Sequence, residues 1–369
     1  MASLDTAAQL RARRLPPLSD LLLWLFGAIL LLAVGWFLLS NLVEHPTRFA
    51  QVSLIGFTNG SIFALIALGY TLVYGILELI NFAHGDNFML GTFETHSIVK
   101  EGSFQIPIFF GKAAALGIPL GTAATAASSP GHRLYAVIMS LIGAMLLCSV
   151  INTTIERIGY KPLRNKPRLA PLITALGFSF ILQNLGLAWK EAGPIPVPDI
   201  LPKGNVFEWK DITYAWEDAI VILITIPLLI ALTWLVRSTK QGKAMRAAAQ
   251  DRDASAMMGI NVDRTISFTF ALAGALAGAA GVVYALNIGT TNFQLGFRLG
   301  LFAFTAAVLG GIGNLSGAVL GGILLGLIAA YNDGFGDARW TTTIIFSILI
   351  LILVFRPSGL LGEQTPEGQ

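Results

Sequence analysis

The residues best suited to chemistry form a polar group between two apolar segments of the chain. The group comprises Asn81, His84, Gly85, Asp86 and Asn87. Polar and ionisable side chains near a membrane are costly and usually face other protein or a water-filled path. The group therefore predicts a pore-lining or gating turn. A hydrogen-bond cluster between helices, which only locks the fold, is an equally good interpretation, whereas the four histidines show no spacing suited to a metal site.

A second group combines three glycines with an asparagine, at Gly310, Gly311, Gly313 and Asn314. This pattern suggests a phosphate-binding loop, but the Gly-Lys-Ser/Thr ending is missing and no Walker pattern occurs elsewhere in the sequence, so we expect no ATP hydrolysis by this chain. Small residues four apart instead favour close helix packing over direct contact with a solute. The predicted translocation path and gate, drawn from both groups and two flanking positions, comprises Asn59, Asn81, His84, Gly85, Asp86, Thr305, Gly310, Gly311, Gly313 and Asn314.

A charged island, residues 237–264, separates two long apolar runs. Its alanine-rich first part has a high helix propensity, and basic residues recur there at a spacing of three. Asp251 or Asp253 can cap a second short helix, and Gly259 can end it in the left-handed conformation. Met257 and Met258 then provide an adaptable apolar tip. The pattern predicts a helix, a break and a short helix; a basic loop lying on lipid headgroups is the alternative.

These groups must be positioned by membrane helices. The 369 residues are 54% hydrophobic and 12% charged, against about 25% charged in soluble domains. The apolar runs lack the alternation of barrel strands and are long enough to span, at about 20 residues each. We expect an all-α polytopic membrane helix bundle with about eight to ten spans. The runs are Leu21–Val43, Phe49–Leu77, Leu134–Ile155, Leu169–Trp189, Ala219–Val236, Thr265–Phe297, Leu299–Asn332 (broken at its glycines) and Trp340–Phe355.

The distribution of basic residues predicts the topology. Residues 157–168 and the island are rich in Lys and Arg, which places both in the cytoplasm together with both termini. The acidic loop 190–218 then lies outside, and its proline-rich part is extended. Residues 102–131 form a re-entrant or loosely packed external segment rather than a full span. Interfacial positions are expected for Glu78, Glu94 and Arg298. Ordinary interfacial or loop positions are expected for the histidines His45, His96 and His132.

The predicted domains are an N-terminal extension (1–48) with an extra helix, a main domain (49–362) and a tail (363–369). The extra helix follows Arg11, Arg13 and Arg14, but it is too long for a signal peptide, so we expect it to be retained. Asn81 and Asn314 each stand at a break before a glycine-bearing helix, which suggests an inverted repeat with broken helices.

Several blocks resemble the permeases of branched-chain amino-acid ABC importers. The island segment QGKAMRAAAQDRDASAMMGINVDR is similar to the cytoplasmic loop of that family, and INFAHGD at Ile80–Asp86 to its first block. The segments Glu156–Gly177, Phe304–Gly326 and RPSGLLG at Arg356–Gly362 match further blocks in order. The resemblance covers about residues 50–362.

The resemblance implies that the island couples the permease to partner ATPases, which use ATP and Mg²⁺, while this chain binds no cofactor or metal and is not an enzyme. The implied partners are two ABC ATPase subunits, a second permease, an external solute-binding protein and lipid, without nucleic acid. The implied location is the inner membrane of a prokaryote. The implied coupling residues are Lys240, Lys243, Arg246, Asp251, Met258, Gly259, Ile260 and Arg264.

The implied function is import of branched-chain or other amino acids by alternating access. Urea or short amides are alternative substrates, because relatives in the family carry them. A stand-alone ion-coupled secondary transporter is the rival interpretation, and it requires an intramembrane carboxylate such as Glu78 or Asp86. A scaffold that only anchors partners is a third.

Overall fold

The computed structural model describes residues 18–107, 115–125, 127–164, 166–167, 169–190 and 192–362. It divides into two compact units that meet between Ala50 and Gln51. The first unit contains α2 (Leu18–Glu44), which confirms the predicted N-terminal helix, and the first residues of α3 (Pro46–Leu77). Arg11, Arg13, Arg14 and the predicted tail lie outside the described residues.

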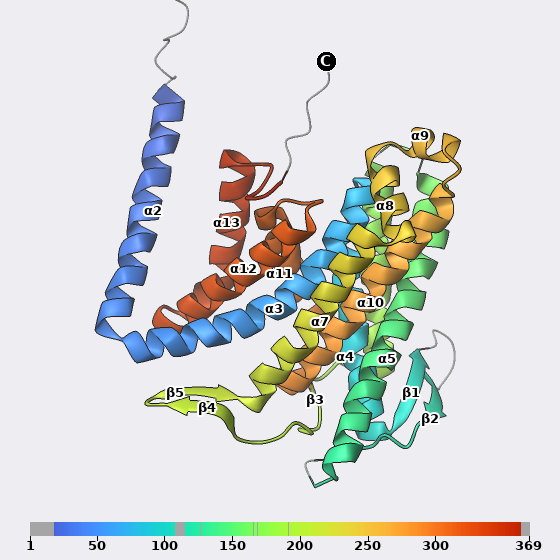
Figure 1. The fold of residues 1–369 in the computed structure, drawn as a ribbon, viewed down its shortest axis with the longest axis horizontal. Helices are drawn as coiled ribbons and strands as arrows, with labels where there is room; N and C mark the ends of the chain where they lie inside the picture. Colours follow the sequence, from blue (N-terminus) through green and yellow to red (C-terminus); the bar gives the residue numbers. More distant parts are fainter. Residues whose placement is uncertain are drawn as a thin grey trace, which may run out of the picture. The chain divides into compact units, whose positions relative to one another are not determined.

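The second unit is a helix bundle (Figure 1). Besides α3, its long helices are α5 (Pro130–Ile155), α6 (Leu169–Lys190), α7 (Trp216–Ser238), α10 (Val262–Ile288), α11 (Leu295–Gly310), α12 (Leu315–Phe335) and α13 (Thr341–Phe355). Its shorter helical elements are α4 (Ala83–His96), α8 (Lys240–Gln250), α9 (Arg252–Met257), η1 (Ser97–Glu101), η2 (Glu156–Tyr160), η3 (Lys161–Leu163) and η4 (Ala338–Trp340).

The all-α membrane architecture is confirmed. Among the described residues, 7 helices are long and apolar enough to cross a membrane, and two shorter apolar helices cover Leu32–Glu44 and Leu295–Gly310. The expected range of spans is reached only when these shorter helices are counted. The run from Leu299 to Asn332 breaks between α11 and α12, as its glycines predict, and α10 ends at Gly289, whose φ of 71° is left-handed.

Three short antiparallel pairs of strands connect the helices. β1 (Ser103–Pro107) pairs with β2 (Ala115–Pro119), so this part of residues 102–131 is a hairpin and not a span. β4 (Asn205–Trp209) pairs with β5 (Ile212–Ala215), and the extended segment before them contributes β3 (Ile195–Pro196), which pairs with β6 (Thr290–Thr291). Figure 1 shows these strands at one end of the bundle and α8 and α9 at the other.

The helix α4 lies in the core and was not predicted as a separate element. All 14 of its residues are buried, and it packs against α5, α6, α10 and α11. Its polar residues interrupt the apolar pattern, so hydropathy does not reveal it. Glu94 and His96 lie on this helix and not in a loop, and they are 0% and 4% exposed.

Glycines allow the central helices to approach one another closely. A Cβ atom on Gly281 of α10 would lie 2.8 Å from the Phe88 carbonyl oxygen of α4. A Cβ on Gly60 of α3 would lie 2.7 Å from the Cα of Ile323 in α12. Among the glycines predicted to serve packing, a Cβ on Gly322 would likewise lie 2.5 Å from the Cα of Ala64, whereas a Cβ on Gly313 would meet no atom within 4 Å.

Candidate functional site

The island has the local structure that its sequence predicts. Thr239 caps α8 by accepting a hydrogen bond from the Gly242 amide at 3.0 Å. Asp251 ends α8 and caps α9, accepting from the Ala254 amide at 2.9 Å. Gly259 follows α9 with a φ of 83°, the left-handed conformation that a glycine adopts without strain. These caps fix the direction of both helices by local interactions.

The island has an attached face and an exposed face. Met245 and Ala248 on α8 are buried against the bundle. The predicted coupling residues Lys240, Lys243, Arg246, Asp251, Gly259 and Arg264 are exposed, and Ile260 is half-buried. At the tip, Met257 is 82% and Met258 is 83% exposed. Such a rigidly mounted apolar tip with basic residues beside it is suited to contact with another protein.

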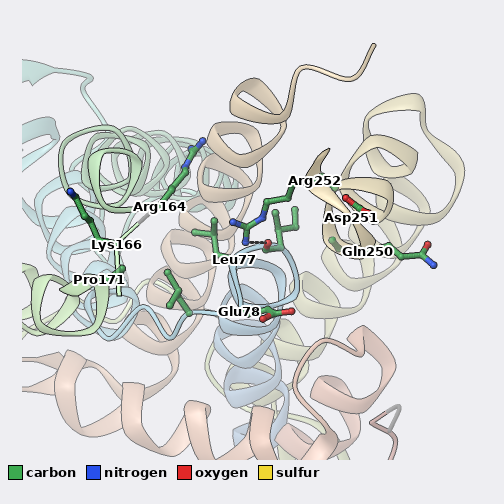
Figure 2. Close-up of a pocket in the computed structure, with 12 residues that line it drawn as sticks. Leu77, Glu78, Arg164, Lys166, Pro171, Gln250, Asp251 and Arg252 are labelled. Atoms are coloured by element: carbon green, nitrogen blue, oxygen red, sulfur yellow. Dashed lines mark hydrogen bonds between the residues drawn. The ribbon is translucent and has the colours of Figure 1, made fainter. Parts of the chain in front are cut away.

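Hydrogen bonds and ion pairs hold the island to the bundle. The guanidinium of Arg246 donates to the Val236 carbonyl of α7. Nη2 of Arg252 donates to the carbonyl oxygen of Ile76, in the last turn of α3, at 2.7 Å (Figure 2). The sequence patterns do not single out Arg252, because its partner is 176 positions away.

A second attachment lies where the island enters α10. Nζ of Lys161 is 2.9 Å from Asp263, and Arg164 pairs with both Asp263 and the buried Glu156. Ser267 donates to Glu156 at 2.7 Å. In the sequence, this cluster could have been predicted from the acidic residues Glu156 and Asp263, which stand at helix ends next to basic segments.

Two of the cavities that adjoin the island also border the end of α3. One, of about 550 Å³, is lined by Arg246 of α8, by Thr71 and Glu78, and by Gly313 and Asn314 of the α11–α12 turn. The structure thus brings part of the predicted coupling surface and part of the predicted path to a common space. The other, of about 370 Å³, lies between the end of α3, the α5–α6 connection and the α8–α9 junction (Figure 2).

The polar group at the start of α4 forms buried hydrogen bonds between helices. Nδ2 of Asn81 donates to Oδ1 of Asn152 at 3.2 Å, and the Tyr160 hydroxyl donates to Oδ1 of Asn81 at 3.1 Å. Asn152 in turn donates to the Phe270 carbonyl at 2.7 Å. Asn87 donates to the Cys148 carbonyl at 3.0 Å. For the asparagines, the geometry matches the interpretation as a cluster that locks the fold.

Asp86 and His84 have different surroundings. Asp86 accepts a hydrogen bond from Ser179 of α6, and Gln183 lies 3.5 Å from the same carboxylate oxygen. The ring of His84 packs edge-on against Tyr70, with ring centroids 4.8 Å apart. Gly85 lies where a Cβ would come within 2.7 Å of Gly300 Cα, so it serves close packing.

The remaining predicted path residues belong to helix packing and to the α11–α12 turn. Thr305 is buried and donates to the Leu301 carbonyl of its own helix at 2.9 Å, and Asn59 is half-buried on α3. Gly310 approaches Gly317 across the turn. These positions do not line either cavity beside the island.

The segment 356–362 folds back onto that turn. The amides of Leu360 and Leu361 donate to the carbonyls of Leu309 and Gly310, each at 2.9 Å. Asn314 donates to the Leu361 carbonyl at 2.8 Å while its Oδ1 caps α12. Asn314 therefore caps a helix, whereas Asn81 sits in a buried network and caps none, so the two asparagines of the suggested repeat have different local roles.

Within the described ranges, no group of three or more His, Cys, Asp or Glu residues is placed to hold a metal ion. Asp86, Glu156 and Asp263 instead pair with hydroxyl, amide or cationic side chains.

Comparison with known proteins agrees with this architecture. The family described as branched-chain amino acid transport system / permease component matches residues 53–354. The permease LivH of Escherichia coli K12 is 34% identical over 327 residues, which cover 88% of this chain and 99% of LivH. BraD of Pseudomonas aeruginosa is 36% identical over 324 residues, 87% of this chain and 98% of BraD. Both are high-affinity branched-chain amino acid transport system permease proteins. No solved structure matches the chain.

Proposed function

The chain belongs to the family of permease components of branched-chain amino acid transport systems, and from this premise we propose that it carries branched-chain amino acids into the cell. It is a multi-pass membrane protein. The substrate is proposed because LivH and BraD are named for branched-chain amino acids, and this chain aligns with each of them over nearly its whole length. We place the protein in the inner membrane of a prokaryote, with both termini and the island in the cytoplasm.

The proposed complex contains two ABC ATPase subunits, a second permease, identical or homologous, and an external solute-binding protein. ATP and Mg²⁺ are used by the ATPases, because this sequence has no Walker pattern. Closure of the ATPases displaces the island, and the bundle then exposes its path to the other side of the membrane, in alternating access.

One observation carries this proposal: the island presents an exposed apolar tip on two capped helices that are bonded to α7 and α3, and where it enters α10 it is paired with the segment after α5. A loop that merely rests on lipid headgroups needs no such anchors. Arg246 bonds to α7, Arg252 to α3, and Asp263 to the segment after α5. A force applied at Met257 and Met258 is thereby delivered to helices that cross the bundle.

Co-purification with the ATPases encoded beside this chain tests the proposal. We expect tagged wild type to retain an ATPase and the double variant Gly259→Asp with Arg246→Glu to lose it. The double variant introduces negative charge beside the tip and a non-glycine residue at a φ of 83°. The exposed Arg157 on η2, changed to Glu, repeats the charge reversal of Arg246→Glu away from the island and should retain the ATPase.

Absence of any ATPase from the wild-type preparation would count against the importer and favour the ion-coupled secondary transporter. Uptake of leucine and of urea by vesicles containing the full complex tests the substrate. Preference for leucine is expected, and uptake of urea alone would overturn the proposed substrate while leaving the family unchanged.

A further inference from the structure

The hydrogen bond between Arg252 and Ile76 joins the island to a turn on the opposite side of a cavity. Arg252 is the first residue of α9, and the Asp251 cap fixes the direction in which that helix starts. Figure 2 shows the Arg252 side chain reaching toward the end of α3 at Leu77. The bond is 2.7 Å long, and a cationic donor makes it stronger than a neutral one.

The acceptor is a group that the α-helix itself leaves open. Ile76 lies in the last turn of α3, which ends at Leu77, so its carbonyl has no α-helical partner four residues on. The side chain of Ile76 is packed in the core, and the residue is 5% exposed. Arg252 therefore donates a hydrogen bond to the open carbonyl at the end of α3, and this helix end is buried in the protein.

The turn beyond Ile76 leads directly to α4. Glu78 has a φ of 55°, a left-handed backbone conformation that is unfavourable for a residue with a side chain. Such positions persist where surrounding contacts impose them and are found at switch segments. Three residues later Asn81 enters the network with Asn152 and Tyr160, and α4 then begins at Ala83.

The cavity of about 370 Å³ beside this bond is lined by residues 76–79, by the α8–α9 junction and by the α5–α6 connection. At the edge of this space, the bond from Arg252 to Ile76 is a discrete polar contact between the island and the turn, in addition to the packing of Met245 and Ala248 against the bundle.

We infer that Arg252 is the positioning residue through which displacement of the island changes the α3–α4 turn and with it the buried helix α4. This inference rests on the proposed function, because it presumes that ATPases move the island. Arg252 bonds to the Ile76 carbonyl of α3, whereas the exposed tip is formed by Met257 and Met258, so its role is separate from ATPase docking.

The test compares Arg252→Met, Arg252→Lys and the exposed control Arg157→Met in the full complex. Methionine keeps the length and apolar character of the arginine stem but removes the donor. We expect the complex with Arg252→Met to retain the ATPases and to hydrolyse ATP near the wild-type rate. The number of substrate molecules carried per ATP should fall about tenfold, which is the factor that the free energy of one charge-assisted hydrogen bond corresponds to. Arg252→Lys should restore at least half of the coupling ratio, and Arg157→Met should match wild type.

Hydrogen exchange of the amides of residues 78–82, measured on the isolated permease, gives a readout that does not need the ATPases. Arg252→Met should speed exchange there about tenfold, by the same correspondence, and Arg157→Met should not.

A wild-type coupling ratio in Arg252→Met, unchanged exchange, or a lysine variant that behaves as the methionine variant would overturn the inference. Loss of the ATPases in Arg252→Met would also overturn it, since Arg252 would then be a docking residue. Failure of the wild type to bind any ATPase would instead defeat the proposed function, and the exchange measurement would still decide whether Arg252 holds the turn.

Discussion

Single polar side chains contribute to the stability of this protein because their hydrogen-bond partners are buried with them. Asn81 joins Asn152 and Tyr160, and each of the three is almost fully enclosed. Removing Asn81 leaves the Asn152 Oδ1 and the Tyr160 hydroxyl without their hydrogen bonds to it, in a place that water does not reach. The cost of that loss exceeds the net gain from forming one hydrogen bond.

Replacing Asn81 with Ala should lower the free energy of unfolding by about 1–3 kcal/mol, because buried donors and acceptors lose their partners. Thermal unfolding of the detergent-solubilised protein would measure the change. Asn184→Ala is the matched control: Asn184 is exposed on α6 and donates to the Phe180 carbonyl of its own helix at 2.8 Å. Equal losses in the two variants would contradict a special role for the buried network.

Asp86 distinguishes the importer from its rival. In the importer this carboxylate accepts hydrogen bonds from α6, and Asn offers an acceptor oxygen of the same size. We expect Asp86→Asn to keep at least about half of wild-type transport, as a conservative swap at a hydrogen-bonded site. An ion-coupled transporter that uses Asp86 would lose transport entirely, which flux measurements in vesicles would reveal.

At the scale of elements, glycines decide which helices meet. A Cβ on Gly278 of α10 would lie 2.8 Å from the Met145 amide nitrogen of α5. On α6, a Cβ on Gly177 would meet no atom within 4 Å. The same residue type therefore serves close packing at one position and not at the other.

Gly278→Val should destabilise the bundle by about 1–3 kcal/mol or more through overpacking between α10 and α5. Gly177→Val should leave the stability of the isolated subunit within about 0.5 kcal/mol of wild type. Unfolding temperatures of both variants, measured side by side, check this contrast. Comparable destabilisation by the two valines would show that the α5–α10 contact is not limiting.

Local signals predicted some elements well and could not predict others. The caps Asp251 and Gly259 act within a few residues, so the island could be read from the sequence. The helix α4 could not, because hydropathy does not distinguish a polar residue in water from one such as Glu94 that is enclosed by protein. The contact from Arg252 to Ile76 depends on the packing of whole helices and has no local signal.

At the scale of the whole molecule, the island and the strand pairs lie at opposite ends of the bundle (Figure 1). This separation agrees with the predicted placement of the island inside the cell and of residues 190–218 outside. Cys148, the single cysteine of the chain, is fully buried. Introduced cysteines can therefore report on sidedness.

A membrane-impermeant maleimide should label Met258→Cys only in inside-out vesicles, because Met258 stands at the island tip. The same reagent should label Trp209→Cys, 58% exposed on β4, only in intact cells. The parent protein, with Cys148 at 0% exposure, is the control and should stay unlabelled. Labelling of both cysteines from one side would overturn the predicted topology.

The fold-back of residues 356–362 also sets an order for biosynthesis. Leu309 and Gly310 leave the ribosome about fifty residues before the amides of Leu360 and Leu361 that bond to their carbonyls. The turn between α11 and α12 therefore cannot form these hydrogen bonds until residues 360 and 361 have been synthesised, however fast the helices insert. A nascent chain that is cut or stalled before residue 360 carries an open turn beside the cavity that it shares with the island.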